Sequence, residues 1–238
     1  SDPPLAENVI YTRFARFLTS KAGFEMTNII MLTLQKRVEI ILKELKRLFP
    51  HAKMVLNYGN NWELLVSVIL SAQCTDKMVN KVTKKLFKKY KTLNDYVKVS
   101  QVEFERDIYS TGFYHNKAKN ILETAKMVKK LFHGTVPNTM NELLTLKGVA
   151  RKTANVVLGN AFGIVEGIAV DTHVIRLTKL WKLTRHADPV KIEQDLMKVL
   201  PKKEWFEFTY RTIEYGRAYC IAKKHNHDKC PMTRLLRS

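Results

Sequence analysis

The stretch MNELLTLKGVARKTANVVLGNAFG, residues 140–163, decides how this chain folds. A short apolar helix ends near Leu146, a tight turn follows, and a second helix begins at about Arg151. Gly148 can take the positive φ angle that such a turn needs. The second helix then points free N–H groups and the positive end of its dipole outward, where they can bind phosphate. The stretch predicts a helix-hairpin-helix that holds a phosphate backbone, with an ordinary helix-to-helix turn as the alternative.

The charge of the whole chain favours the same kind of partner. Its 238 residues carry 41 Lys and Arg against 22 Asp and Glu, a formal net charge of +19 with a sequence pI near 9.8. Basic side chains displace condensed counterions from phosphates, so an excess of this size indicates a nucleic acid as partner. A basic solvated surface is the alternative. The hydrophobic content of 45% is typical of a globular protein with its own core.

Three features of the sequence indicate where the protein is expected to work. No apolar run approaches membrane-spanning length, so we expect no membrane partner. The first residues lack the basic and apolar segments of an export signal. Three widely spaced cysteines suit a reducing compartment better than a disulfide framework. We expect an intracellular protein associated with DNA, in the cytoplasm or nucleoid.

Helical periodicity covers most of the chain. Residues 115–132 place their apolar side chains on one stripe, with five lysines around the remainder. Residues 76–90 repeat this pattern, with Asp76 placed to cap the helix. Segments 35–49 and 189–200 are typical of two further amphipathic helices. No stretch alternates with period two for long enough to indicate a sheet, so the sequence predicts an all-α protein.

Two charged residues near the predicted hairpin could perform chemistry. Lys152 lies on the first turn of the second helix, beside Arg151 and Lys147. A lysine amine is a nucleophile only when it is deprotonated, and cationic neighbours favour that form. Asp171 is the lone carboxylate in the apolar segment 167–177, where it is also placed to cap the following helix. A lysine and a carboxylate beside a hairpin that holds DNA support attack at a sugar C1′ carbon.

Three segments of the chain together carry a family resemblance. They are LKGVARKTANVVL with the later AFG and AVDTH (residues 146–173), LLVSVILSAQCTD (64–76) and STGFYHNKAKNI (110–121). In this order and at this spacing they resemble the endonuclease III family, the helix-hairpin-helix DNA glycosylases with abasic-site lyase activity. The resemblance runs from about Gln35 to Tyr219, most of the chain, and the combination is highly specific.

The resemblance implies an all-α, two-domain helix-hairpin-helix DNA glycosylase fold, with the DNA in the cleft between the domains. A six-helix domain that contains the hairpin would cover residues 53–164. Residues 26–52 plus 165–238 would form the second helical domain. Residues 1–25 would be an N-terminal extension, either a docked helix or a tail.

The resemblance also implies an activity in base excision repair. A monomer would remove oxidised pyrimidines from double-stranded DNA and then cleave the strand at the abasic site. Lys152 matches the family's nucleophile, which forms a Schiff base and allows β-elimination, and Asp171 matches its essential carboxylate. Two alternatives stay open. One is another lesion, either mismatched thymine or uracil or abasic sites alone, and the other is a catalytically silent DNA-binding homologue.

Further residues are expected to contact DNA. Gln73 matches the residue that fills the space left by the extruded nucleotide, because an amide both donates and accepts; a polar cap on a helix end is the alternative. Phe113 stands where relatives often carry a leucine wedge, or else belongs to the core. His173 is expected to lie behind the site or to contact a phosphate, or else to be a buried histidine with its hydrogen bonds satisfied. The hairpin residues expected at the DNA backbone are Gly148, Val149, Ala150 and Arg151.

The C-terminal stretch CIAKKHNHDKC, which starts at Cys220, departs from the family pattern. Most relatives carry cysteines in the pattern C-x6-C-x2-C-x5-C, which hold a [4Fe–4S] cluster. Cys220 and Cys230 match the first and third cysteines, but His227 and Leu236 stand at the second and fourth. With His225 added, the loop could form a Cys2His2 zinc site, but the His-x-His spacing is unusual and the loop is rich in lysine. We therefore expect no cofactor, neither the iron–sulfur cluster nor zinc.

Overall fold

The structure is a computed structural model that describes residues 21–237, with side chains from 34 to 236. The described residues form helices joined by loops and contain no strand, so the predicted all-α fold class is confirmed. The α-helices are α2 (Lys21–Leu48), α3 (Asn61–Leu70), α4 (Asp76–Lys89), α5 (Leu93–Lys98), α6 (Gln101–Ile108), α7 (Tyr114–Leu131), α8 (Met140–Thr145), α9 (Arg151–Val157), α10 (Thr172–Leu180), α11 (Pro189–Val199), α12 (Trp205–Ala218) and α13 (Pro231–Arg237). The short helical turns are η1 (Tyr109–Thr111), η2 (Leu158–Phe162), η3 (Lys202–Glu204) and η4 (His227–Lys229).

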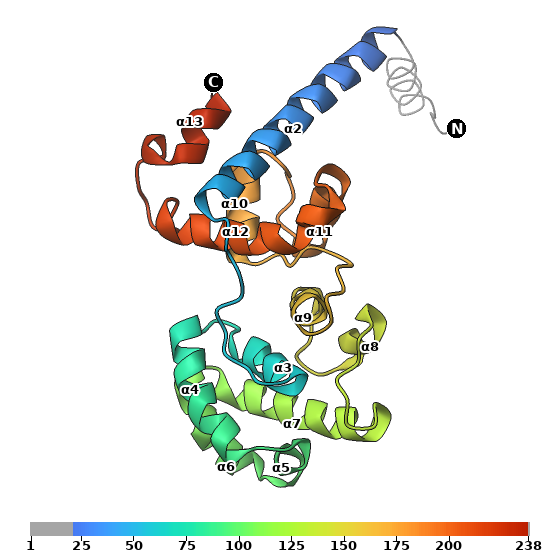
Figure 1. Cartoon of the computed structure of the whole chain (residues 1–238), viewed down its shortest axis with the longest axis vertical. Coiled ribbons are helices and arrows are strands. Elements are labelled where there is room, and N and C mark those ends of the chain that lie inside the picture. Colours follow the sequence, from blue (N-terminus) through green and yellow to red (C-terminus); the bar gives the residue numbers. More distant parts are fainter. Residues whose placement is uncertain (1–20, 238) are drawn as a thin grey trace, which may run out of the picture.

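The helices fall into two groups along the long axis of the molecule (Figure 1). Helices α3–α8 form one end, and α2 with α10–α13 forms the other. Helix α9 lies between the two groups. The chain crosses between them after α2 and again after α9, so each group draws on segments that are far apart in the sequence.

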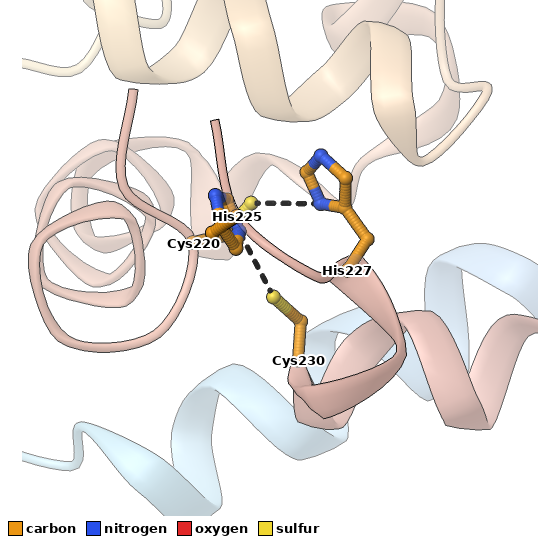
Figure 2. Close-up of side chains that lie close together, drawn as sticks. All are labelled: Cys220, His225, His227 and Cys230. Atoms are coloured by element: carbon orange, nitrogen blue, oxygen red, sulfur yellow. Dashed lines mark hydrogen bonds between the residues drawn. The ribbon is translucent and has the colours of Figure 1, made fainter. Parts of the chain in front are cut away.

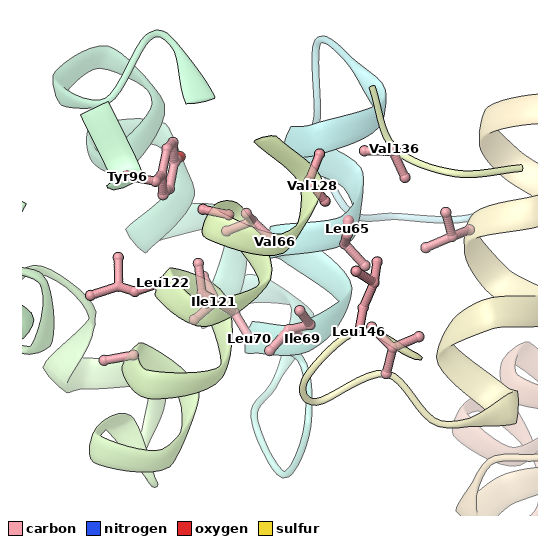
Figure 3. Packing of buried hydrophobic residues seen from close by; sticks show 14 of the residues in the cluster. Leu65, Val66, Ile69, Leu70, Tyr96, Ile121, Leu122, Val128, Val136 and Leu146 are labelled. Carbon is pink, nitrogen blue, oxygen red and sulfur yellow. The ribbon is translucent and has the colours of Figure 1, made fainter. Parts of the chain in front are cut away.

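The first group packs around the apolar helix α3. The sequence of α3 is apolar on nearly all sides, and Leu65 and Leu70 are completely buried, as expected for a helix surrounded by others. Helix α7 places Ile121 and Val128 against it, and Tyr96 of α5 belongs to the same core (Figure 3). The ring centroid of Tyr96 lies 5.2 Å from that of Trp62 in α3. The amphipathic helices around α3 therefore leave most of their lysines on the surface, with Lys117 of α7 as a buried exception.

A second core lies at the other end of the molecule. Trp181 and Tyr215 are buried there with their ring centroids 5.4 Å apart. Helix α2 contributes Ile41 and Leu45 to this core, although more than a hundred residues separate them from the rest. The N–H of Met232, in α13, donates to the Oη of Tyr215 at 3.0 Å, so the C-terminal helix is attached to the same core.

Helix α9 continues directly into a π-helical turn, η2. In this turn the Nδ2 of Asn160 donates to the carbonyl of Val156 at 2.7 Å and to the Oη of Tyr210 at 2.6 Å. Gly159 faces the ring of Phe206, and a Cβ at this position would lie 2.4 Å from that ring. The glycine and the turn together let α9 and η2 pack closely on α12.

We propose that these two cores correspond to the predicted domains, 53–164 and 26–52 plus 165–238. The predicted extension, residues 1–25, lies outside the described residues except where α2 begins at Lys21. None of the helices in the described part of the chain is long and apolar enough to span a membrane.

Candidate active site

A cavity of about 220 Å³ lies where the two groups of helices meet. Its volume is below the range of about 300–1,000 Å³ that is typical for drug-sized ligands, so it suits a single small group. The walls come from the segment before α3 and from α3, α4, α9, α10 and α12. The lining residues that bear charged or titratable side chains are Lys53, Cys74, Asp76, Lys152, Asp171, His173, Tyr210, Glu214 and Arg217.

The cavity brings Lys152 and Asp171 together on its wall. Lys152 lies in the first turn of α9, half-buried, after an N-cap residue, Ala150, that offers the helix no side-chain hydrogen bond. Asp171 is the N-cap of α10, as the sequence predicts, and its Oδ1 accepts the N–H of Val174 at 2.8 Å. This bond fixes the orientation of the carboxylate at the cavity wall.

His173 lines the same wall, with its Nδ1 buried and without a hydrogen-bond partner among the described residues. Gly216 makes this position possible, because a Cβ there would lie 2.3 Å from Nδ1. Burial lowers the pKa of His173, and Arg176 and Arg217 lower it further, although the charge of Asp171 opposes them. The imidazole is therefore neutral at neutral pH and faces the cavity as an uncharged hydrogen-bonding group.

An ion pair that the sequence did not reveal lies beside the cavity. Arg217 of α12 donates to Asp76 of α4 at 2.5 Å, which connects the two groups of helices. The prediction that Asp76 caps α4 is wrong, because Thr75 is the N-cap and accepts the N–H of Met78. Asp76 lies one residue further on, where its carboxylate can reach α12. Residues 141 positions apart give no local signal of such a pair.

The hairpin between α8 and α9 is held against α7. Gly148 has a φ of +75°, and a Cβ there would lie 3.0 Å from the side chain of Asn120. The hydroxyl of Thr124 donates to the carbonyl of Lys147 at 2.9 Å, and Val149 is buried. The backbone angle therefore favours glycine, and a Cβ would also require the side chain of Asn120 to move.

Arg151 has one edge of its guanidinium bound within the protein. Its Nε and Nη2 donate to the two carboxylate oxygens of Glu193 at 2.7 and 2.9 Å, and Asn155 donates to the same carboxylate at 2.8 Å. Glu193 lies on α11 and is only 3% exposed. Arg151 thus links α9 to α11, and only the rest of its side chain is free to meet another molecule.

Gln73 and Phe113 lie on two exposed loops that one buried lysine connects. Both residues have left-handed backbone angles, with φ of +52° and +49°, and Phe113 is 63% exposed, which excludes the core position considered for it. The Nζ of Lys117 donates to the carbonyls of Leu70 and Thr111, at 2.9 and 2.8 Å, just before each loop. The two loops are therefore fixed relative to each other.

Comparison with known proteins identifies the family. The description "HhH-GPD superfamily base excision DNA repair protein" fits residues 66–202. The chain belongs to this superfamily. Within it, the chain is 48% identical to Endonuclease III of Synechocystis sp. (strain ATCC 27184 / PCC 6803 / Kazusa) over 205 residues, which cover 86% of this chain and 94% of that relative. It is 47% identical to Endonuclease III of Bacillus subtilis (strain 168), over 85% of this chain and 92% of that protein.

Solved structures of this superfamily agree with the relatives. A trapped covalent intermediate of Endonuclease III with DNA, an estranged-adenine complex, matches with a TM-score of 0.81 and 45% identity, over 84% of this chain and 94% of that one. A non-covalent Endonuclease III–DNA complex matches with a TM-score of 0.80 at the same identity and coverage. The family and the two-domain helix-hairpin-helix fold predicted from the sequence are confirmed.

The prediction that this member of the superfamily takes no cofactor is wrong. Its endonuclease III homologues normally carry a [4Fe–4S] cluster, and the structure brings four potential metal ligands together: Cys220, His225, His227 and Cys230. Their donor atoms all lie within 4.8 Å of one another. The unusual His-x-His spacing argued against a metal site, but a loop that bends at η4 can bring both imidazoles to one point.

Proposed function

We propose that this base excision repair enzyme removes oxidised pyrimidines from double-stranded DNA and cleaves the abasic strand, using Lys152 as its nucleophile. The observation that carries this assignment is the placement of Lys152 and Asp171 on the wall of one small cavity beside the hairpin. Its relatives named Endonuclease III support the reaction class, a DNA glycosylase with abasic-site lyase activity.

In the first step, the neutral amine of Lys152 attacks C1′ of the damaged nucleotide. The nitrogen forms a bond to C1′ while the bond between C1′ and the base breaks, and the base leaves with the bonding electrons. Asp171 stabilises the positive charge that develops on the sugar or accepts the proton that the amine gives up. Its fixed orientation as the N-cap of α10 means that little reorganisation is needed at that moment.

In the second step, the sugar ring opens and the adduct becomes a Schiff base between Lys152 and C1′. The Schiff base draws electrons from C2′, which loses a proton, and the 3′ phosphate leaves by β-elimination. Hydrolysis of the remaining imine returns the free amine. Neutral His173, on the same wall, is available to accept or donate a hydrogen bond during these proton transfers.

Access to the cavity requires the nucleotide to leave the duplex. Gln73 and Phe113 are proposed to occupy the space it vacates, the amide toward the orphaned base and the ring as a wedge. The hairpin residues Gly148 and Ala150 are proposed to hold the backbone through their main-chain N–H groups, because the N–H of Val149 between them already donates to the carbonyl of Leu146 at 3.3 Å. Arg151 is proposed to contribute the part of its side chain that the pair with Glu193 leaves free. This work takes place where the DNA is, in the cytoplasm or nucleoid.

Borohydride trapping tests the assignment. The wild-type chain should form a covalent adduct with a duplex that carries an oxidised pyrimidine, and Lys152→Ala should form none. Lys53→Ala is the matched control, because Lys53 lines the same cavity. Adduct formation by Lys152→Ala, or its loss in Lys53→Ala alone, would show that another amine is the nucleophile. A panel of duplexes with oxidised pyrimidines, mismatched thymine or uracil, and abasic sites decides the substrate.

A further inference from the structure

The loop that follows α12 holds four side chains whose donor atoms point toward one another (Figure 2). We propose that this loop binds one zinc ion through two thiolates and two imidazoles: Cys220, His225, His227 and Cys230. None of the four residues lines the cavity that contains Lys152, and the proposal does not depend on the proposed function.

The distances between the donor atoms suit a single tetrahedral ion. The Sγ of Cys220 lies 3.7 Å from the Nδ1 of His227, and the Sγ of Cys230 lies 3.4 Å from the Nε2 of His225. Bond lengths of about 2.3 Å for Zn–S and about 2.0–2.1 Å for Zn–N place the ligands of tetrahedral zinc about 3.3–3.8 Å apart. The separations, all within 4.8 Å, then need to contract by at most about 1 Å on binding.

The protonation of His225 is already arranged for a metal. Its Nδ1 lies 2.8 Å from the backbone carbonyl of Lys223, which can only accept a hydrogen bond. Nδ1 must therefore carry the proton, and the lone pair is on Nε2, the atom that faces Cys230. A histidine that binds a metal typically donates its other N–H to a carbonyl or carboxylate in this way.

The two thiols lie in a buried environment that supports ligation. Cys220 is 0% and Cys230 is 1% exposed, while both histidines are half-buried. Arg176 of α10 donates from Nη1 to the Sγ of Cys220 at 3.3 Å and from Nη2 to the carbonyl of Cys220 at 2.6 Å. A guanidinium on the sulfur favours a ligand that carries negative charge, and both thiols lose their protons when a metal binds.

This donor set does not fit a cluster that four cysteines hold. The loop and α13 offer two thiols, and Leu236, at the position of the family's fourth cysteine, packs against the second core. His225 lies outside the family spacing altogether. A [2Fe–2S] centre with two cysteines and two histidines binds both thiolates to one iron and both imidazoles to the other. Here each thiol lies beside an imidazole, as around a single ion.

Zinc would give this loop the internal stability that its sequence lacks. Most residues between Cys220 and Cys230 are exposed, and η4 is the only regular turn among them. Four bonds to one ion close the loop and fix the start of α13. Loss of the ion should therefore let the loop open locally without unfolding the helical cores.

Metal analysis of the full chain tests the proposal. Protein purified under reducing conditions should contain about one zinc ion per chain and neither iron nor acid-labile sulfide in that proportion. Stoichiometric iron and sulfide would overturn the proposal, and so would metal-free protein that binds no added zinc. His225→Ala and Cys230→Ser should each lose the zinc. His51→Ala and Cys74→Ala, which change residues outside the loop, and Lys152→Ala should keep it.

Two further measurements separate the loss of a ligand from the loss of the fold. Wild-type protein that is stripped by a chelator and reloaded with cobalt(II) should show the intense visible bands of a tetrahedral thiolate site, and His227→Ala should shift them. Trypsin should cut the stripped protein at the exposed lysines of the loop about tenfold faster than the zinc form, because the loop opens locally. Weak octahedral bands, or equal cleavage rates, would contradict the site.

Discussion

His173 shows how a single residue of the cavity is set by its surroundings. Two features act on it: the closeness of α12 at Gly216, and burial, which outweighs the nearby carboxylate of Asp171. A ring that is neutral at neutral pH can approach two arginines without repulsion. Both packing and nearby charges therefore determine the position and the protonation state of His173.

The lowered pKa of His173 predicts a dependence of stability on pH. In the unfolded chain this side chain titrates near its ordinary value of 6.5, and in the folded chain below it. Between the two values the unfolded state binds more protons, so stability is full above 6.5 and is lost as pH falls through the folded value. His173→Gln should flatten the decline of melting temperature below pH 6.5. If the melting temperature of the variant declines as steeply as that of wild type, the lowered pKa of His173 is contradicted.

The two proposed catalytic residues could be named from the sequence because their signals are local. Lys152 follows a Gly turn at a helix start, and Asp171 is an N-cap in an apolar segment, so a few neighbouring residues define each position. The pairs Arg217 with Asp76 and Arg151 with Glu193 join distant segments. Such pairs depend on the completed fold, and no local pattern indicates them.

At the scale of elements, the turn at Gly148 joins two short helices, and it predicts a specific effect of a methyl group. Gly148→Ala should cost about 1–2 kcal/mol because alanine disfavours a φ of +75°. The added Cβ would also press on Asn120 and shift the hairpin. We expect weaker binding to undamaged and damaged duplex alike, measured by fluorescence anisotropy.

Gly134 offers the matched control for this change. Its φ is +82°, and a Cβ there would meet only Leu93 at 4.0 Å. Gly134→Ala should therefore lose similar stability and keep its affinity for DNA. Equal affinity losses in the two variants would mean that the hairpin has no special part in binding.

The two exposed loops depend on Lys117 at their base. Lys117→Met removes two charge-assisted hydrogen bonds, each worth about 1.5–3 kcal/mol, and leaves two carbonyls without that donor. Chemical denaturation should show a loss of about 3 kcal/mol. Lys119→Met, on the exposed face of the same helix, should change stability by less than about 0.5 kcal/mol. Similar values for both variants would contradict the role of Lys117.

The sequence predicted the helices well, but it did not predict the long-range contacts that hold them together. The periodicity of residues 115–132 placed a helix correctly, yet it counted Lys117 among the surface lysines. A lysine is almost always exposed, and only the meeting of two loops over α7 explains its burial. Likewise, His225 lies off the family spacing, and only the bend of the folded loop brings it to the other ligands.

At the scale of the whole molecule, the pair of Arg217 with Asp76 connects the two groups of helices, and the pair of Arg151 with Glu193 connects α9 to the second group. Glu193→Gln should weaken one of them by removing the charge that faces Arg151, and the amide can keep only part of the hydrogen bonding. Because the side chain of Arg151 is 36% exposed, we expect the free energy of unfolding to fall by about 1–3 kcal/mol, less than for a fully buried pair. Denaturation monitored by tryptophan fluorescence measures it.

Glu103→Gln serves as the reference for that variant. Glu103 pairs with Lys89 on the surface, where the side chain of Glu103 is 52% exposed. The Glu103→Gln variant should therefore keep nearly the same free energy of unfolding as wild type. A Glu193→Gln variant as stable as Glu103→Gln would show that the link between α9 and α11 contributes little.

The number of residues in the π-helical turn after α9 affects the distance between the two proposed catalytic residues. Lys152 lies in the first turn of the helix that runs into η2, and Asp171 follows the segment that leaves this turn. One residue fewer in the turn would rotate the departing chain by about 100° and shorten it by about 1.5 Å. Insertions and deletions here would therefore displace the carboxylate from the amine without changing either residue, so this turn should tolerate no change in length.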